Sequence, residues 1–460
     1  MRRTLGILVA FAMLVAIVLG VHQLGFQDEV LTFQGLFGDF IEFDRRHLAL
    51  GLTLGFTLVG GWLVGELAAP LGLPRMSGYL AFGVAFGPSV ATLAGGGVEA
   101  LIPTAHRGAL RAVDALAISL IALMAGGELQ LRTVRRSLRA AIGTTAAEVL
   151  LVFLPIAVAI GLLGARFGPL AGLPAAELWF VASVAGLLAV GNSPAIVIAV
   201  LKETRARGPM RDAVLTTTIT KDLLQIVVAA VVFAAGAAAL TPGGDAAGPA
   251  GVASLIWHLI GSLGIGVAIG FASAWLVDHA GDRIGLVTAG MGVAVAAIAE
   301  ACGISPLLTG LAAGLVLANL WPERTARMFR SMQDVFLPVS VIFFANAGAS
   351  IDLAELASVW PLALGLVAVR LFLMRSAVTA GMRWARVPEP AAGLAWTGFI
   401  AQAGVSLALA REFESAFAGY AFTGTVTTLL VAMIAFHEAI GPPIFAWGLR
   451  RAGEVPRDDA

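Results

Sequence analysis

Residues 191–222 read GNSPAIVIAVLKETRARGPMRDAVLTTTITKD, and two interruptions of apolar sequence in this stretch decide how the chain folds. The first is GNSP at 191–194, in the middle of the apolar run 178–201. The second is Lys221-Asp222, inside the next apolar run. Ionisable side chains and broken backbone are both costly in the hydrocarbon core of a membrane. Each interruption is therefore a hypothesis for a functional site.

Composition places the chain among multi-pass membrane proteins. Of its 460 residues, 59% are hydrophobic and 13% are charged, whereas a soluble domain carries about 25% charged residues. The formal net charge is zero, and the charges lie in short loops, so no basic face for nucleic acid is expected. Cys302 is the only cysteine, which excludes disulfides within the chain and metal sites built on cysteine.

Apolar runs of about 20 residues predict an all-α protein that crosses the membrane about fourteen times. No segment shows the alternating pattern of a membrane β-barrel, so strands are not expected. The run from Leu5 to Phe26 favours a retained first helix over a cleaved secretory signal. The predicted helices are 4–25, 47–70, 76–93, 109–128, 139–163, 176–202, 210–238, 252–277, 283–301, 304–320, 328–349, 358–386, 389–411 and 418–449.

Basic residues concentrate in alternate loops, including Arg132–Arg139, Lys202–Arg211 and Arg324–Arg330. Cytoplasmic loops of membrane proteins carry an excess of Lys and Arg. The pattern predicts that both termini are cytoplasmic and that the loop after the first helix, with Asp28 and Glu29, is external.

A second broken helix is predicted where GFIAQAG, residues 398–404, interrupts the span 389–411 with Gln402 between glycines. The two broken helices are separated by an odd number of spans and enter the membrane from opposite sides. This spacing predicts two inverted six-helix repeats, 47–238 and 283–449, joined by a helix at 252–277. Such repeats with crossing discontinuous helices are common in secondary transporters.

Asp222 is the strongest candidate for an ion or proton site, because isolated carboxylates inside membranes usually mark ion pathways. The alternative is a carboxylate fixed in an ion pair. At the first break, the polar groups of Asn192 and Ser193, with backbone freed by Gly191 and Pro194, are ligands of the type that hard cations prefer. The same two side chains are equally suited to capping the half-helices.

Three charged residues within spans have candidate structural roles. Arg370 is expected to hold the crossing half-helices together by pairing with a buried acid such as Glu148. Lys221 is one of only two lysines in the chain. It is interpreted either as a countercharge for an acid such as Glu148 or as a group that releases its own proton when a cation binds.

Motifs of membrane enzymes are incomplete. Gly95-Gly96-Gly97 lacks the Gly-Lys-Ser/Thr of a phosphate-binding loop, and His437-Glu438 is followed at position 441 by glycine where a zinc protease has its second histidine. We therefore expect no enzyme, no cofactor, and no metal site beyond that of a transported monovalent cation.

At this point seven segments, in order, resemble the monovalent cation:proton antiporters of the Kef and Nha type. They are PRMSGYLAFGVAFGP (74–88), LMAGGELQLRTVRR (123–136), GNSPAIVIAVLKE (191–203), TKDLLQIV (220–227), SPLLTGLAAGLVLAN (305–319), FFANAGASIDL (343–353) and GFIAQAGVSLALA (398–410). The family's aspartate maps onto Asp222, its polar pair onto Asn192 and Ser193, and its stabilising basic residue onto Arg370. Lys221 and the Asn-Ser-Pro at the first break depart from the family's usual residues.

The resemblance implies an elevator-type exchanger of Na⁺ or K⁺ for protons in a cell membrane, as in the bacterial inner membrane, with a homodimerising scaffold and a mobile core. The implied parts are an extra N-terminal helix and acidic loop (1–46), scaffold (47–138), core (139–238), linker helix (239–282), scaffold (283–349), core (350–449) and a cytoplasmic tail (450–460). Gln402 and Gly404 belong to the second broken helix.

Two other functions remain open. One is an inverted-repeat carrier that binds an anion through Lys221 and Arg370. The other is a membrane sensor that transports nothing.

Overall fold

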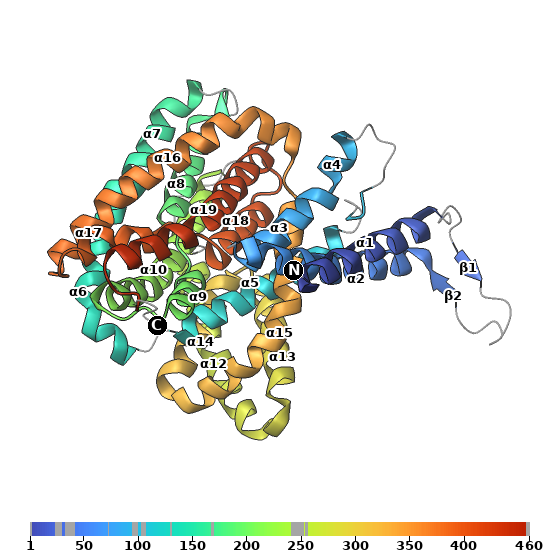
Figure 1. Cartoon of the computed structure of the whole chain (residues 1–460), viewed down its shortest axis with the longest axis horizontal. Helices are drawn as coiled ribbons and strands as arrows, with labels where there is room; N and C mark the ends of the chain where they lie inside the picture. The colour runs from blue at the N-terminus through green and yellow to red at the C-terminus, as the bar shows by residue number, and fades with distance from the viewer. Residues whose placement is uncertain are drawn as a thin grey trace. The chain divides into compact units, whose positions relative to one another are not determined.

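The computed structural model describes residues 2–23, 30–32, 42–71, 73–93, 100–102, 107–128, 131–166, 170–240, 253 and 256–456, and nearly all of them are helical (Figure 1). A helix satisfies its backbone donors and acceptors within one segment, which an apolar run in lipid requires. The described residues form two compact units, Met1–Val113 with Pro338–Leu353, and Asp114–Leu337 with Ala354–Ala460.

The first unit is built on α2 (Arg45–Ala68) and α3 (Arg75–Phe86), which pack together with α1 (Arg2–Gln23) and the end of α15 (Pro322–Ala349). Phe56 and Phe82 are buried in its core. Gly83 allows α3 to cross α15 closely, because a β-carbon there would stand 1.8 Å from the carbonyl oxygen of Ala345. Short helix α4 (Pro88–Leu93) follows α3.

A small hairpin of β1 (Val30–Thr32) and β2 (Glu42–Asp44) joins α1 to α2, with Val30 opposite Asp44. These three-residue strands lie in the connection between two helices, and the fold is all-α, as the sequence predicts. Residues 24–29 and 33–41, with most of the predicted acidic loop, lie outside the described residues.

The second unit holds the remaining helices. They are α5 (Arg107–Glu128, from Asp114), α6 (Leu131–Glu148), the π-helical turn η3 (Val149–Phe153), α7 (Leu154–Leu163), η4 (Gly164–Arg166), α8 (Ala175–Val190), α9 (Pro194–Thr204), α10 (Pro209–Leu240), η6 (Trp257–Gly261), α12 (Ser262–His279), η7 (Gly281–Arg283), α13 (Ile284–Cys302), α14 (Pro306–Leu320), α16 (Leu353–Trp384), α17 (Ala391–Leu394), η8 (Ala395–Phe399), α18 (Gly404–Ala416) and α19 (Thr423–Arg451).

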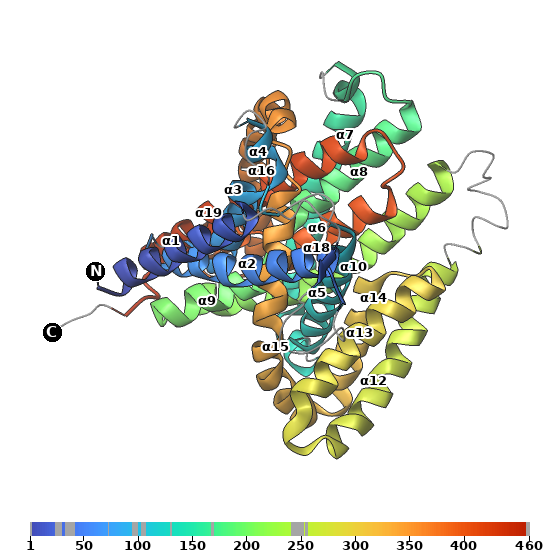
Figure 2. The same cartoon turned by 90° about the vertical axis from the view of Figure 1, so that its right-hand side faces the viewer.

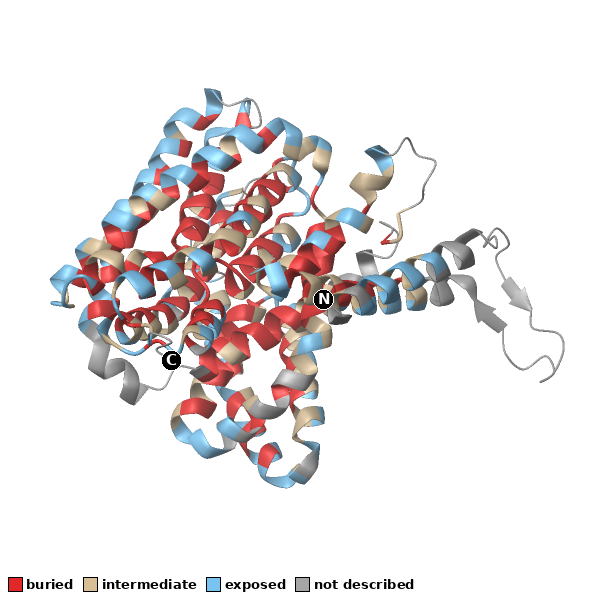
Figure 3. Ribbon diagram, in the orientation of Figure 1, coloured by how far each residue is buried: buried red, intermediate tan, exposed pale blue. Residues whose placement is uncertain are grey.

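Within this unit α12, α13 and α14 pack as one group (Figure 2), and α8, α10, α18 and α19 pack as another. Figure 3 shows buried residues along the helices of the second group and exposed residues along α7 and α16. The exposed side chains of α7 and α16 include Leu162, Phe372 and Trp384. Large apolar side chains exposed along whole helices are typical of surfaces that face lipid.

Every predicted helix coincides with helical backbone, but the count of fourteen spans is not confirmed. Among the described residues, nine helices are long and apolar enough to cross a membrane, and the bent pair Ala391–Phe399 with Gly404–Ala416 makes ten. Four further apolar helical segments within the described residues are 10–17 residues long, of which Pro306–Leu320 is a whole helix and the others are parts of α1, α5 and α15. The start of the predicted helix 252–277 falls partly on residues outside the described ranges.

Candidate functional site

Two helices of the second unit are interrupted where the sequence predicts. Helix α8 ends at Val190 and α9 begins at Pro194, with Ser193 as its N-cap, accepting a hydrogen bond from the backbone N–H of Ile196 at 3.3 Å. Proline fits the first turn of a helix because it has no N–H to leave unbonded. The η8 helix ends at Phe399 and α18 begins at Gly404, with a bend of 42°.

The two breaks lie against each other. The side-chain amide of Gln402, in the second break, donates to the carbonyl of Leu188, in the last turn of α8, at 2.5 Å. The backbone N–H of Gly191 bonds the same carbonyl at 3.0 Å. Helices α8 and α18 are also in contact. The breaks therefore form one crossing point inside the second unit.

Arg370, from α16, binds both broken helices at this crossing. Its fully buried guanidinium donates to the carbonyls of Ala189 (2.7 Å) and Gly191 (2.6 Å) and to those of Phe399 (3.1 Å) and Ile400 (3.0 Å). The last carbonyls of a helix have no partner within it and form the negative end of its dipole. A guanidinium with five donors suits two such ends at once.

The partner of Arg370 differs from the prediction. Glu148 was expected to bond Arg370, but it bonds Lys221, whose Nζ lies 2.8 Å from both Oε1 and Oε2. The physical reason is that the breaks free backbone carbonyls, which local sequence does not reveal as partners. Both side chains of the Lys221–Glu148 pair are buried, at 1% and 0% exposure. The Lys221 ammonium also lies 4.8 Å from the ring centroid of Phe399, within range of a cation–π contact.

Asp222 is 1% exposed and lies beside the crossing. Two residues near it on α10 locate Asp222 relative to the broken helices. Lys221 lies against Phe399 of the second broken helix, and Gln225 lies close to Gly191 of the first. Residues three apart on a helix share a face, so Asp222 and Gln225 are neighbours. The structure thus brings Asp222, both breaks and Arg370 to one place.

Three buried polar side chains surround Gly191. The side-chain nitrogen and oxygen of Asn192 and Gln225, and the hydroxyl of Ser406, have no hydrogen-bond partner among the described residues. A β-carbon on Gly191 would stand 2.3 Å from Ser406 Oγ and 2.8 Å from Gln225 Nε2. Neither Gln225 nor Ser406 is among the site residues expected from the sequence. The only sequence signal for Gln225 is that Thr218, Asp222 and Gln225 follow one another on one face of α10.

The chemistry of this place is that of oxygen ligands. One carboxylate, amide oxygens and hydroxyls suit a hard cation. Within the part of the chain that the structure describes, no group of three or more His, Cys, Asp or Glu side chains is placed to hold a metal ion. A neutral or singly charged oxygen site favours a monovalent cation or a proton.

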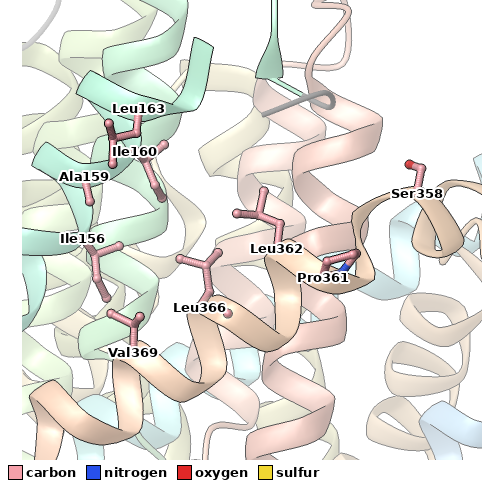
Figure 4. A pocket seen from close by; sticks show the side chains of 10 residues that line it. Ile156, Ala159, Ile160, Leu163, Ser358, Pro361, Leu362, Leu366 and Val369 are labelled. Carbon is pink, nitrogen blue, oxygen red and sulfur yellow. The ribbon is translucent and has the colours of Figure 1, made fainter. Parts of the chain in front are cut away.

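A pocket of about 460 Å³ lies elsewhere in this unit, between α7 and α16 (Figure 4). Its walls include Ile156, Ile160, Leu362 and Leu366, and Ser358 is its one hydroxyl. Apolar walls of this kind offer no ligands for an ion, so we do not assign the site to this pocket.

The family model described as "Sodium/hydrogen exchanger, transmembrane" matches residues 54–447. The fold is similar to two solved structures of the sodium proton antiporter MjNhaP1 from Methanocaldococcus jannaschii. One, at pH 8, has a TM-score of 0.67 and 18% identity over 89% of this chain and 99% of that chain. The other, from an electron-microscopy map, has 0.64 and 17% over 90% and 99%. A search of curated proteins gives no significant match.

Proposed function

Because the chain belongs to the sodium/hydrogen exchanger family, it is a multi-pass cation:proton antiporter and not an enzyme, and we propose that Asp222 is the carboxylate at which cation and proton compete. The resemblance found in the sequence is thereby confirmed at the level of the family. The observation that carries the proposal is the burial of Asp222 beside the crossing of the two broken helices.

Competition for one carboxylate is sufficient for exchange. Asp222 holds either a proton or a cation, so each can cross only when the other has left. Asn192 and Ser193 complete the proposed site. Ser193 Oγ accepts one hydrogen bond as an N-cap and keeps a second lone pair for a cation, while both polar atoms of the Asn192 side chain have no partner in the described part of the chain.

The other charged groups have structural roles in this proposal. Lys221 is bonded to Glu148, so its ammonium does not take the place of the cation at Asp222. Arg370 is bonded to four carbonyls of the broken helices. An anion carrier would need one of these two cations for its substrate, and their existing bonds argue against that alternative. Membership of an exchanger family argues against a sensor that transports nothing.

The proposal extends to movement and assembly. We propose alternating access by an elevator movement, with 139–238 and 350–449 as the mobile core and 47–138 and 283–349 as a scaffold that forms a homodimer. The segments 1–46, 239–282 and 450–460 are the proposed N-terminal addition, linker and tail. Loop charges support cytoplasmic termini in a cell membrane, with the lipid bilayer as surrounding solvent.

Exchange in proteoliposomes tests the central claim. A pH gradient is imposed, Na⁺, K⁺ and Li⁺ are added separately, and recovery of a pH-sensitive dye is followed. We expect Na⁺ or K⁺ to release protons in the wild type, and Asp222→Asn to abolish the signal. Full exchange in Asp222→Asn would remove Asp222 from the mechanism. Absence of a response to every cation in the wild type would refute cation:proton antiport itself.

A further inference from the structure

The apolar pocket between α7 and α16 (Figure 4) is a cavity of about 460 Å³ that the described side chains leave open. It is open because two of its lining residues are small, Ala159 on α7 and Gly365 on α16. A β-carbon on Gly365 would stand in open space, with nothing beyond its own helix within 4 Å. A cavity of this volume is within the range of sites that hold small ligands, about 300–1,000 Å³.

Water is a poor occupant for this pocket. Among the described residues that line it, Ser358 has the one polar side chain, and its hydroxyl already donates to the carbonyl of Glu355 at 2.7 Å. A buried water needs about two to four polar partners, and cavities with apolar walls stay dry. An empty cavity would deprive its walls of dispersion contacts. The lining therefore favours an apolar occupant.

The floor of the pocket belongs to the protein interior and its mouth belongs to the outer surface. Ile156, Ile160 and Leu366 are buried, whereas Ala159 and Gly365 are exposed. On either side of the mouth, the surfaces of α7 and α16 carry the exposed large apolar side chains that are typical of contact with lipid. The hydrocarbon of the bilayer is therefore continuous with the cavity.

Two tryptophans mark the end of the pocket that lies nearest to the membrane surface. Trp360, beside the lining residues of α16, is 55% exposed. Trp179 packs on α7, because a β-carbon on Gly161 would stand 2.4 Å from its ring. Tryptophan rings concentrate where the hydrocarbon meets the lipid headgroups. Ser358 and Leu163 thus lie at the headgroup end of the pocket, and the occupant enters from that level.

We propose that this pocket binds one acyl chain of a membrane phospholipid, whose headgroup lies at the level of the two tryptophans. The site is separate from the crossing of the broken helices and does not depend on which ions are exchanged. Its two walls nonetheless run to that crossing, because Val369 precedes Arg370 on α16 and α7 packs against α8, which ends at the first break. The bound chain packs against the lipid side of these helices and so stabilises them.

Variants that fill the pocket test the proposal. Gly365→Phe and Ala159→Leu place side-chain atoms in the cavity from α16 and from α7. Gly264→Phe on α12 is the matched control, because Gly264 is also exposed on an apolar helix and has nothing within 4 Å of its β-carbon position. Each protein is purified, delipidated in detergent and titrated with a phosphatidylcholine that carries a photoreactive diazirine on one acyl chain. Mass spectrometry of the irradiated protein then identifies the labelled residues.

We expect saturable labelling of the lining segments of α7 and α16 in the wild type and in Gly264→Phe. Labelling there should fall at least about tenfold in Gly365→Phe and Ala159→Leu, which corresponds to a loss of about 1.4 kcal/mol of binding free energy. Added phosphatidylcholine should also raise the melting temperature of the wild type and of Gly264→Phe, because a ligand that binds only the folded state stabilises it. The filled variants should lose this rise. Should one filled variant fail to fold, the other decides the matter.

Competition identifies the occupant. Unlabelled phosphatidylcholine should displace the probe from the pocket, and displacement by oleic acid alone would overturn the assignment to a phospholipid. Equal labelling of the lining segments in the wild type and the filled variants, or labelling that never saturates, would overturn the site and leave only general contact with lipid. None of these measurements involves a transported ion. A wild type without cation-driven exchange would therefore overturn the proposed function and leave the lipid site unaffected.

Discussion

Removing one member of the Lys221–Glu148 pair should destabilise the protein far more than removing both. The Lys221 nitrogen lies 2.8 Å from both oxygens of Glu148, and neither side chain is more than 1% exposed. Breaking a buried pair leaves one charge without compensation at a cost of about 3–5 kcal/mol, whereas replacing both members is often neutral or stabilising. Lys221→Met and Glu148→Gln should each lower the free energy of unfolding by about 3 kcal/mol or more.

The double variant Lys221→Met/Glu148→Gln is expected within about 1 kcal/mol of the wild type. Reversible unfolding in mixed detergent micelles, followed by tryptophan fluorescence, measures all four corners of this double-mutant cycle. The exposed pair of Arg211 and Asp212, with nitrogen and oxygen 2.6 Å apart, is the control, and Arg211→Gln should cost no more than about 1 kcal/mol. Additive effects of the two single substitutions would refute the assignment of a buried, coupled pair.

Two further predictions concern α16 and the loop after it. Arg370→Lys should destabilise the protein by about 2 kcal/mol or more and abolish exchange, since an ammonium cannot reach carbonyls of both breaks. The control is Arg375→Lys, which changes an exposed contact with Trp396 and should be nearly neutral in the same unfolding and exchange assays. Equal effects of the two substitutions would contradict the role of Arg370. The hydrogen bond from Arg383, at 2.7 Å, lowers the pKa of Glu389 below its usual value. The contribution of Glu389 to the free energy of unfolding should be present above the unfolded pKa of about 4.3 and lost as pH falls through the lower folded pKa. The difference in melting temperature between the wild type and Glu389→Gln should therefore disappear in acid. A difference that grows in acid would contradict this prediction.

The sequence predicts the helices well because each helix depends mainly on the residues of its own segment. An apolar run long enough to span lipid must satisfy its own backbone, and helix is the available solution. The first break is local too, since Ser193 and Pro194 are ordinary signals for a helix start. The short apolar helices, such as Pro306–Leu320, explain why the count of spans cannot be taken from run length alone.

Partners at the site depend on distance in space, so from the sequence Glu148 is a candidate partner of both Lys221 and Arg370, and the structure places it on Lys221. Lys221 and Glu148 are 73 residues apart in sequence, and Arg370 is 181 residues from Ala189. Buried acids and bases can be recognised by type, but several pairings satisfy the same charges. Gln225 and Ser406 cannot be singled out from the sequence, because an amide or a hydroxyl in a membrane helix is common, and only the approach of both to Gly191 sets them apart.

The four carbonyl bonds of Arg370 also have a mechanical consequence. Sliding one broken helix past the other would pull two of its acceptors away and leave a full positive charge in surroundings of low polarity, which is strongly unfavourable. The half-helices on either side of the guanidinium must therefore be displaced together, as one stiff body. We therefore expect any change of shape during the proposed transport cycle to occur at the outer boundaries of that body, while the atoms of the proposed ion site within it keep their mutual distances.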